Sequence, residues 1–87
     1  MSTNEGEIAE VKAMINNLED KISRLENRIE AAERDGRSEE YILSLRSELI
    51  ELRRLIIELR KKENILLEKF NQIGAVGKLS DILSYLN

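Results

Sequence analysis

The chain has 87 residues, a formal net charge of −3 at pH 7, and no His, Cys, Pro or Trp. This length allows one small domain with little interior for a pocket. Without Cys there is no disulfide framework or zinc-finger site, and without His the commonest general base and metal ligand is missing. We therefore expect no enzyme activity, no cofactor and no metal site, and the negative charge gives no reason to expect nucleic acid.

The first ten residues, MSTNEGEIAE, contain neither a basic n-region nor an apolar h-region, so they do not predict a secretory signal. No apolar run is longer than the LII at 55–57, which does not predict a transmembrane segment. We expect residues 1–6 to be a flexible N-terminus and the protein to be intracellular, cytoplasmic by default.

Residues 7–34 carry apolar side chains spaced alternately by three and four residues. This heptad pattern, with Ile at each a position, predicts a helix with coiled-coil packing. The seam consists of Ile8, Val11, Ile15, Leu18, Ile22, Leu25, Ile29 and Ala32.

The stretch AAERDGRSEEY (31–41) indicates a turn over 35–38. If the first seam continued unbroken, it would place Arg46, Arg53 and Arg60 at buried d positions. Gly36 suits the left-handed residue that ends a helix, and Ser38 can cap the next one. The alternative is one continuous helix that tolerates Gly36 at a cost of about 1 kcal/mol.

Residues 39–73 carry the second heptad seam. It consists of Ile42, Leu45, Leu49, Leu52, Ile56, Leu59, Glu63, Leu66, Phe70 and Ile73. A fold at Gly36 pairs Ile29 with Leu45 and every other seam pair in one register. Glu63 then lies opposite Val11, either as a solvated carboxylate at a frayed end or as a polar residue that selects register or partner.

Charges beside the two seams test this hairpin. The register brings together four attractive pairs and the repulsive pair Lys12–Arg60. The attractive pairs are Glu26–Arg46, Glu19–Arg53, Arg28–Glu48 and Glu7–Lys69. The first helix alone also suits a parallel dimer, because Lys21 could pair with Glu26, and Arg28 with Glu33, of a second copy.

The second helix has more apolar positions than one partner helix can cover. Leu43, Ile50, Leu55 and Ile57 lie beside its seam, while Phe70 and Ile73 extend past the end of the shorter first helix. Such a wide apolar face is normally buried on more than one side. The simplest arrangement is two hairpins in a four-helix-bundle homodimer. Alternatively, these residues contact another helical protein or the rest of a longer chain.

The last segment predicts a third element. Gly74 and Gly77, within GAVGK, indicate a linker over 74–78. Leu79, Ile82, Leu83 and Leu86 then follow helical spacing, which predicts a short amphipathic helix over 79–86. We expect it to fold back over Phe70 and Ile73, or alternatively to dock on a partner.

The basic stretch RRLIIELRKK (53–62) could suggest a nucleic-acid or membrane-surface patch, but acidic residues of the same helix balance it. We therefore predict an all-α fold: an antiparallel coiled-coil helical hairpin with a short C-terminal helix that associates into a four-helix-bundle homodimer. The expected function is oligomerisation or protein–protein interaction without catalysis. The alternative is a small adaptor that presents its second or C-terminal helix to a different protein.

Overall fold

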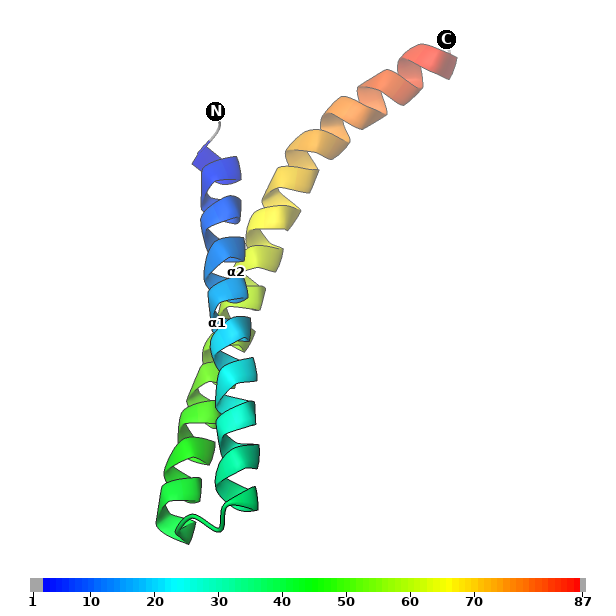
Figure 1. Cartoon of the computed structure of the whole chain (residues 1–87). Coiled ribbons are helices and arrows are strands. Elements are labelled where there is room, and N and C mark those ends of the chain that lie inside the picture. The colour runs from blue at the N-terminus through cyan, green and yellow to red at the C-terminus, as the bar shows by residue number, and fades with distance from the viewer. Residues whose placement is uncertain (1–2, 87) are drawn as a thin grey trace.

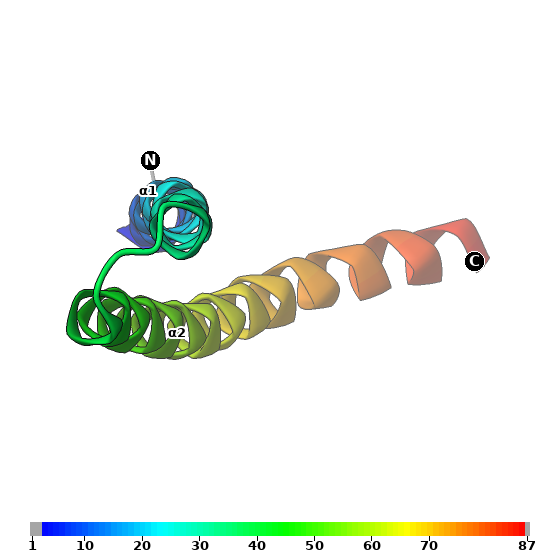
Figure 2. The ribbon, with the colours of Figure 1, turned by 60° about the horizontal axis from the view of Figure 1, so that its bottom comes forward.

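The computed structural model describes the backbone of residues 3–86 and the side chains of residues 5–69. It contains two helices, α1 (Thr3–Arg34) and α2 (Glu39–Leu86), and no strand within the described residues. The helices run in opposite directions and pack side by side (Figures 1 and 2). The all-α helical hairpin predicted from the sequence is therefore confirmed.

The turn after α1 has the hydrogen bonds of a Schellman motif. The Arg37 N–H donates to the Ala32 carbonyl at 2.9 Å, and the Gly36 N–H donates to the Glu33 carbonyl at 3.2 Å. Gly36 has a φ of 67°, which a residue with a Cβ adopts only at a cost. This glycine therefore reverses the chain as the sequence indicated.

Ser38 begins α2 as its N-cap. Its Oγ accepts a hydrogen bond from the Tyr41 N–H at 3.2 Å, which satisfies one of the free donors at the helix start. Glu39 and Glu40 occupy the first turn, where negative charge favours the positive end of the helix dipole. Two local signals, a glycine and a cap, therefore set the hairpin's direction.

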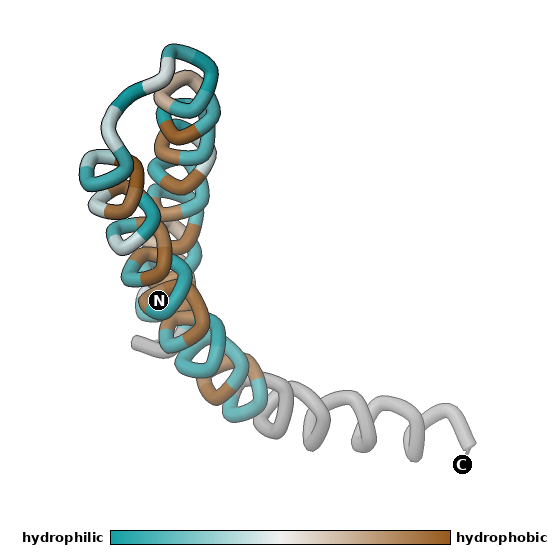
Figure 3. Tube along the Cα trace, turned by 90° about the horizontal axis from the view of Figure 1, so that it is seen from below, coloured by the Kyte–Doolittle hydropathy of each residue, from teal (hydrophilic) through white to brown (hydrophobic). Residues whose placement is uncertain are grey.

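The core is the seam between the two helices, and it divides into two clusters. The cluster near the turn contains Leu25, Ile29, Ala32, Leu45 and Leu49, against which Ile22, Tyr41, Ile42 and Leu52 pack. The cluster near the open end contains Ile8, Val11, Ile15 and Leu66, with Leu59 and Leu67 packed against it. Figure 3 shows the corresponding apolar positions recurring along both helices.

The seam residues are enclosed to different degrees. The buried ones are Ile8, Val11, Ile15, Leu25, Ile29, Ala32, Leu45, Leu49, Ile56 and Leu66. The half-buried ones are Leu18, Ile22, Ile42, Leu52, Leu59 and Glu63. Even Val11, the most enclosed, remains 3% exposed, because two helices leave each seam position open on one edge.

Three expected boundaries are corrected. Helix α1 begins at Thr3, so residues 3–6 are helical. Helix α2 continues through 74–78 to Leu86, so neither the expected linker nor the separate helix over 79–86 is present. A glycine inside a helix costs about 1 kcal/mol relative to Ala, but it keeps its N–H donor and does not force an end as Pro would.

The end of α2 does not fold back over the hairpin. Instead α2 continues past the N-terminal end of α1 (Figure 1). The side chains of Phe70 and Ile73, and the surroundings of Gly74 and Gly77, lie outside the described part of the chain. The molecule measures 71 × 23 × 17 Å, and the 48 residues of α2 at about 1.5 Å per residue account for the longest dimension.

Neither helix, over the residues described, includes a stretch long and apolar enough to cross a membrane.

Candidate protein interface

The seam separates two long sides of the hairpin. We call one the ion-pair side, where Arg46, Arg53 and Arg60 of α2 face α1. We call the other the groove side, where Lys21 and Arg28 of α1 lie beside α2. The two sides differ in how their charges are balanced and in where apolar side chains are exposed.

Three interhelix ion pairs follow the ion-pair side at seven-residue intervals. They are Arg46–Glu33, Arg53–Glu26 at 3.8 Å and Arg60–Glu19 at 2.6 Å. Their side chains are about half exposed, so each pair contributes only about 0–1 kcal/mol to stability. Together they link the helices along three successive heptads.

Each arginine pairs one heptad nearer the turn than the sequence analysis expected. Helical side chains lean toward the N-terminus of their own helix. Arg46 therefore leans toward the turn, whereas Glu33 leans away from it, and the two side chains converge. Arg46 and Glu26 would lean apart, so the expected Glu26–Arg46 and Glu19–Arg53 pairs do not form.

The corrected pairing also removes the predicted repulsion. Arg60 lies with Glu19 rather than against Lys12. Glu7 and Lys69 form no ion pair among the described side chains. The buried clusters agree with the expected seam pairing, because Ile29 lies in one cluster with Leu45 and Ile8 lies in the other with Leu66.

The apolar row of α2, formed by Leu43, Ile50 and Ile57, lies beside the ion-pair side. These three side chains are spaced by seven residues and are 54–57% exposed. On the outer face of α2, Arg54 pairs with Glu51 at 3.1 Å and Lys61 pairs with Glu58 at 3.8 Å. The apolar row is therefore bordered on both edges by cations that already have carboxylate partners.

Leu55 does not belong to this apolar row. It lies on the groove side, where it lines a groove of about 300 Å³ together with Met14, Asn17, Leu18, Lys21 and Leu59. Leu55 is 51% exposed and Met14 is 49% exposed. The four residues that the sequence analysis placed in one wide face are therefore divided between two sides of the hairpin.

Met14 was missed because it stands alone beside the first seam. Met14 lies at a g position of the heptad. In an antiparallel hairpin the g positions of the two helices face each other, so this position indicated that Met14 would lie beside α2. Ile65 is a second omission: it is 55% exposed and lies outside both the apolar row and the groove.

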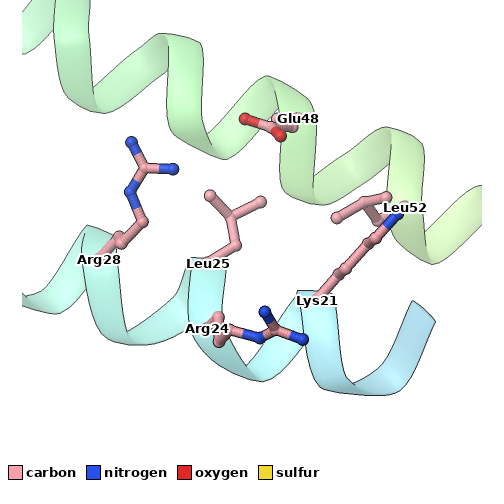
Figure 4. Close-up of a pocket in the computed structure, with 6 residues that line it drawn as sticks. All are labelled: Lys21, Arg24, Leu25, Arg28, Glu48 and Leu52. Atoms are coloured by element: carbon pink, nitrogen blue, oxygen red, sulfur yellow. The ribbon is translucent and has the colours of Figure 1, made fainter. Parts of the chain in front are cut away.

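A second hollow, of about 390 Å³, continues the groove toward the turn. Lys21, Arg24, Leu25 and Arg28 of α1 line it with Glu48 and Leu52 of α2 (Figure 4). Lys21 borders both hollows. Neither Lys21 nor Arg24 forms an ion pair with any described residue.

Arg28 is held by a tyrosine rather than by a carboxylate. It donates a hydrogen bond to the Tyr41 hydroxyl at 3.3 Å, and this bond, with a smaller attraction to Glu48, raises the pKa of Arg28 above its ordinary value. The guanidinium of Arg37 lies 4.3 Å from the centre of the Tyr41 ring, within cation–π range. The expected attraction between Arg28 and Glu48 is therefore present but is not a close ion pair.

No cluster of carboxylates among the described residues could hold a metal ion. The expectation of a non-catalytic protein stays a prediction.

Comparisons with protein-family models, with curated proteins and with solved structures found no match.

Proposed function

We propose that this chain is a self-association module that joins two copies through the apolar row of α2 and has no catalytic activity. The observation that carries the proposal is the apolar row itself: Leu43, Ile50 and Ile57 are large, evenly spaced and more than half exposed. A row of this kind on a helix is typical of packing against another helix.

The even spacing of the apolar row suits a second copy of the same chain. A two-fold axis at Ile50 would bring Ile50 against its own counterpart and Leu43 against Ile57 of the partner subunit. Such an interface uses the same surface on both copies and closes at a dimer. The apolar row would span about 21 Å, or 14 residues of helix.

The charges bordering the apolar row favour the same occupant. Arg46, Arg53 and Arg60 are paired across the hairpin, and Arg54 and Lys61 are paired within α2. Two copies can therefore approach without placing unbalanced cations against each other. A partner selected by charge would instead require charges that are free on this surface.

The position of the apolar row suggests a layer of helices. At 100° per residue, the row lies about 130° around α2 from the middle of the seam. A square four-helix bundle needs contact faces about 90° apart. We therefore infer that the two α2 helices lie antiparallel in the middle, with one α1 at each outer edge.

The association should be concentration-dependent. Fully burying a Leu or Ile contributes roughly 1.5–3 kcal/mol, and about half of each side chain in the apolar row is already covered by its own helix. In a dimer, the exposed halves of six side chains, three from each copy, must offset an association cost of roughly 4–15 kcal/mol. We thus expect a reversible dimer.

The test is the molar mass of the full chain by sedimentation equilibrium over a range of concentrations. Ile50→Glu/Ile57→Glu should remain at the monomer mass at concentrations where the unchanged chain is a dimer, with its helical circular dichroism retained. The matched control is Leu55→Glu/Ile65→Glu, which adds the same charge at equally exposed positions outside the apolar row and should still form dimers. A dimer that survives the first change, or is lost only in the control, contradicts the proposal.

Small-angle X-ray scattering of the same samples distinguishes the arrangement. The monomer is 71 Å long. An antiparallel dimer with its axis at Ile50 would extend to roughly 110 Å, because α2 continues 36 residues past the axis in each direction. A dimer mass with a particle still near the monomer length would indicate parallel α2 helices instead.

A further inference from the structure

The groove side combines an apolar floor with an unbalanced positive edge. Met14, Leu18, Leu55 and Leu59 line the groove, and Lys21 connects it to the hollow that Arg24 and Arg28 border. These groups form a continuous strip along the hairpin because Lys21 belongs to both hollows. The strip lies on the other side of the seam from the ion pairs that border the apolar row.

The charge on this strip is what distinguishes it from the rest of the surface. The hollow has three cations and one carboxylate, Glu48, among its lining residues (Figure 4). On the ion-pair side every arginine that faces α1 has a glutamate within 4 Å, whereas Lys21 and Arg24 have no such partner among the described residues. Cations left without partners beside an apolar groove favour a ligand that carries both apolar and acidic groups.

We propose that the groove side binds an acidic amphipathic helix of another protein. Its apolar residues would pack between Met14 and Leu55, and its carboxylates would pair with Lys21, Arg24 and Arg28. This is a helix-in-groove interaction, in which apolar anchors supply most of the affinity and the charged edge supplies orientation and specificity. The surface is separate from the apolar row, so this inference does not depend on the proposed self-association.

The geometry defines the spacing that a bound helix needs. Leu18 marks the apolar groove, and Arg24 and Arg28 lie six and ten residues farther along α1, which corresponds to about 9 Å and 15 Å. A helix lying parallel or antiparallel to α1 therefore needs carboxylates two to three turns from its apolar anchors. A second copy of this chain fits less well, because it would bring the same three cations to the contact.

The test uses a synthetic helical peptide of roughly 18 residues, about five turns. Its Leu residues lie at i, i+3, i+4 and i+7 and form the apolar anchors. Its Glu residues lie two to three helical turns away from these anchors. The matched peptide has every Glu replaced by Lys. Fluorescence anisotropy of each labelled peptide is measured against the full chain at low salt. We expect the acidic peptide to bind at least about tenfold more tightly than the basic one, a difference of about 1.4 kcal/mol.

Variants then locate the binding site. Lys21→Glu/Arg24→Glu should reverse the order of the two peptides, because it converts the positive edge into a negative one. Met14→Glu and Leu55→Glu, made separately on the two helices, should each weaken both peptides. Ile50→Glu/Ile57→Glu, in the apolar row, should leave the acidic peptide's Kd unchanged.

Three results would overturn the inference, each with helical circular dichroism retained. The first is equal binding of the two peptides or no binding of the acidic one. The second is a Lys21→Glu/Arg24→Glu chain that keeps the original preference. The third is a change in the chain's molar mass on Met14→Glu or Leu55→Glu alone, which would make a second copy the occupant of the groove.

Discussion

The two sides of this hairpin carry comparable cations but balance them differently. On the ion-pair side, Arg46, Arg53 and Arg60 each have a glutamate of α1 as partner. On the groove side, Lys21 and Arg24 have no described carboxylate within ion-pair distance. One side therefore uses its charges to align the two helices, and the other leaves its charges available to a ligand.

This difference follows from the residues at the facing heptad positions. On the ion-pair side the facing e positions of three successive heptads hold Glu on α1 and Arg on α2, so the same pair repeats three times. On the groove side the g positions are mixed: Met14 and Leu55 are apolar, and Glu48 is the one carboxylate that lines the hollow. The repeated charge pairs at the e positions align the two helices, whereas the mixed residues at the g positions leave apolar and charged groups exposed.

The largest expected effect is at the seam on which both sides depend. Ile15 is 6% exposed. Ile15→Ala should lower the free energy of unfolding by an amount near the low end of the usual range of about 2–5 kcal/mol, because the seam is open at its edges. Ile65→Ala is the matched control: the same substitution on a 55% exposed residue should change stability by about 0.5 kcal/mol or less. Urea unfolding followed by circular dichroism measures both. Equal losses would mean that the seam is not the shared support of the two sides.

The turn sets how α1 and α2 pack and therefore which residues lie on each side of the seam. Substitution of its glycine should give the next largest change in stability. Gly36→Ala should destabilise the hairpin by about 1–2 kcal/mol, because φ is 67° although nothing lies within 4 Å of an added Cβ. Gly6→Ala, in the first turn of α1 and equally uncrowded, should instead stabilise by up to about 1 kcal/mol. The same substitution thus has opposite signs at the two positions, and urea unfolding again provides the measurement. A stabilising Gly36→Ala would contradict the left-handed turn.

The smallest effect compares the two sides directly. Glu19→Lys/Glu26→Lys on the ion-pair side should lower the free energy of unfolding by roughly 0.5–2 kcal/mol, since two ion pairs become repulsive contacts. Lys21→Glu/Arg24→Glu on the groove side exchanges the same number of charges and should change it by about 0.5 kcal/mol or less. Thermal unfolding at low and high salt measures the difference, which should shrink as the Debye length falls from about 30 Å to 3 Å. Equal effects at low salt would remove the distinction between the sides.

The sequence by itself determined the helical hairpin and its turn. Heptad spacing, a glycine in the left-handed region and a serine cap act over a few residues, and Gly36 and Ser38 form the motifs that their residue types favour. The linker predicted at 74–78 from its two glycines is wrong, because α2 continues through these residues. The propensity cost of a glycine is small enough for the hydrogen-bonded helix to continue.

Only the tertiary structure decided which groups meet across the seam. The direction in which side chains lean sets Glu33 rather than Glu26 as the partner of Arg46, and this depends on the position of both helices at once. The same placement separates Leu55 from Leu43, Ile50 and Ile57, and brings it to the groove with Met14. The number of apolar positions on α2 can be counted from the sequence. Which of them lie on the ion-pair side and which on the groove side depends on where α1 packs, because the seam separates the two surfaces.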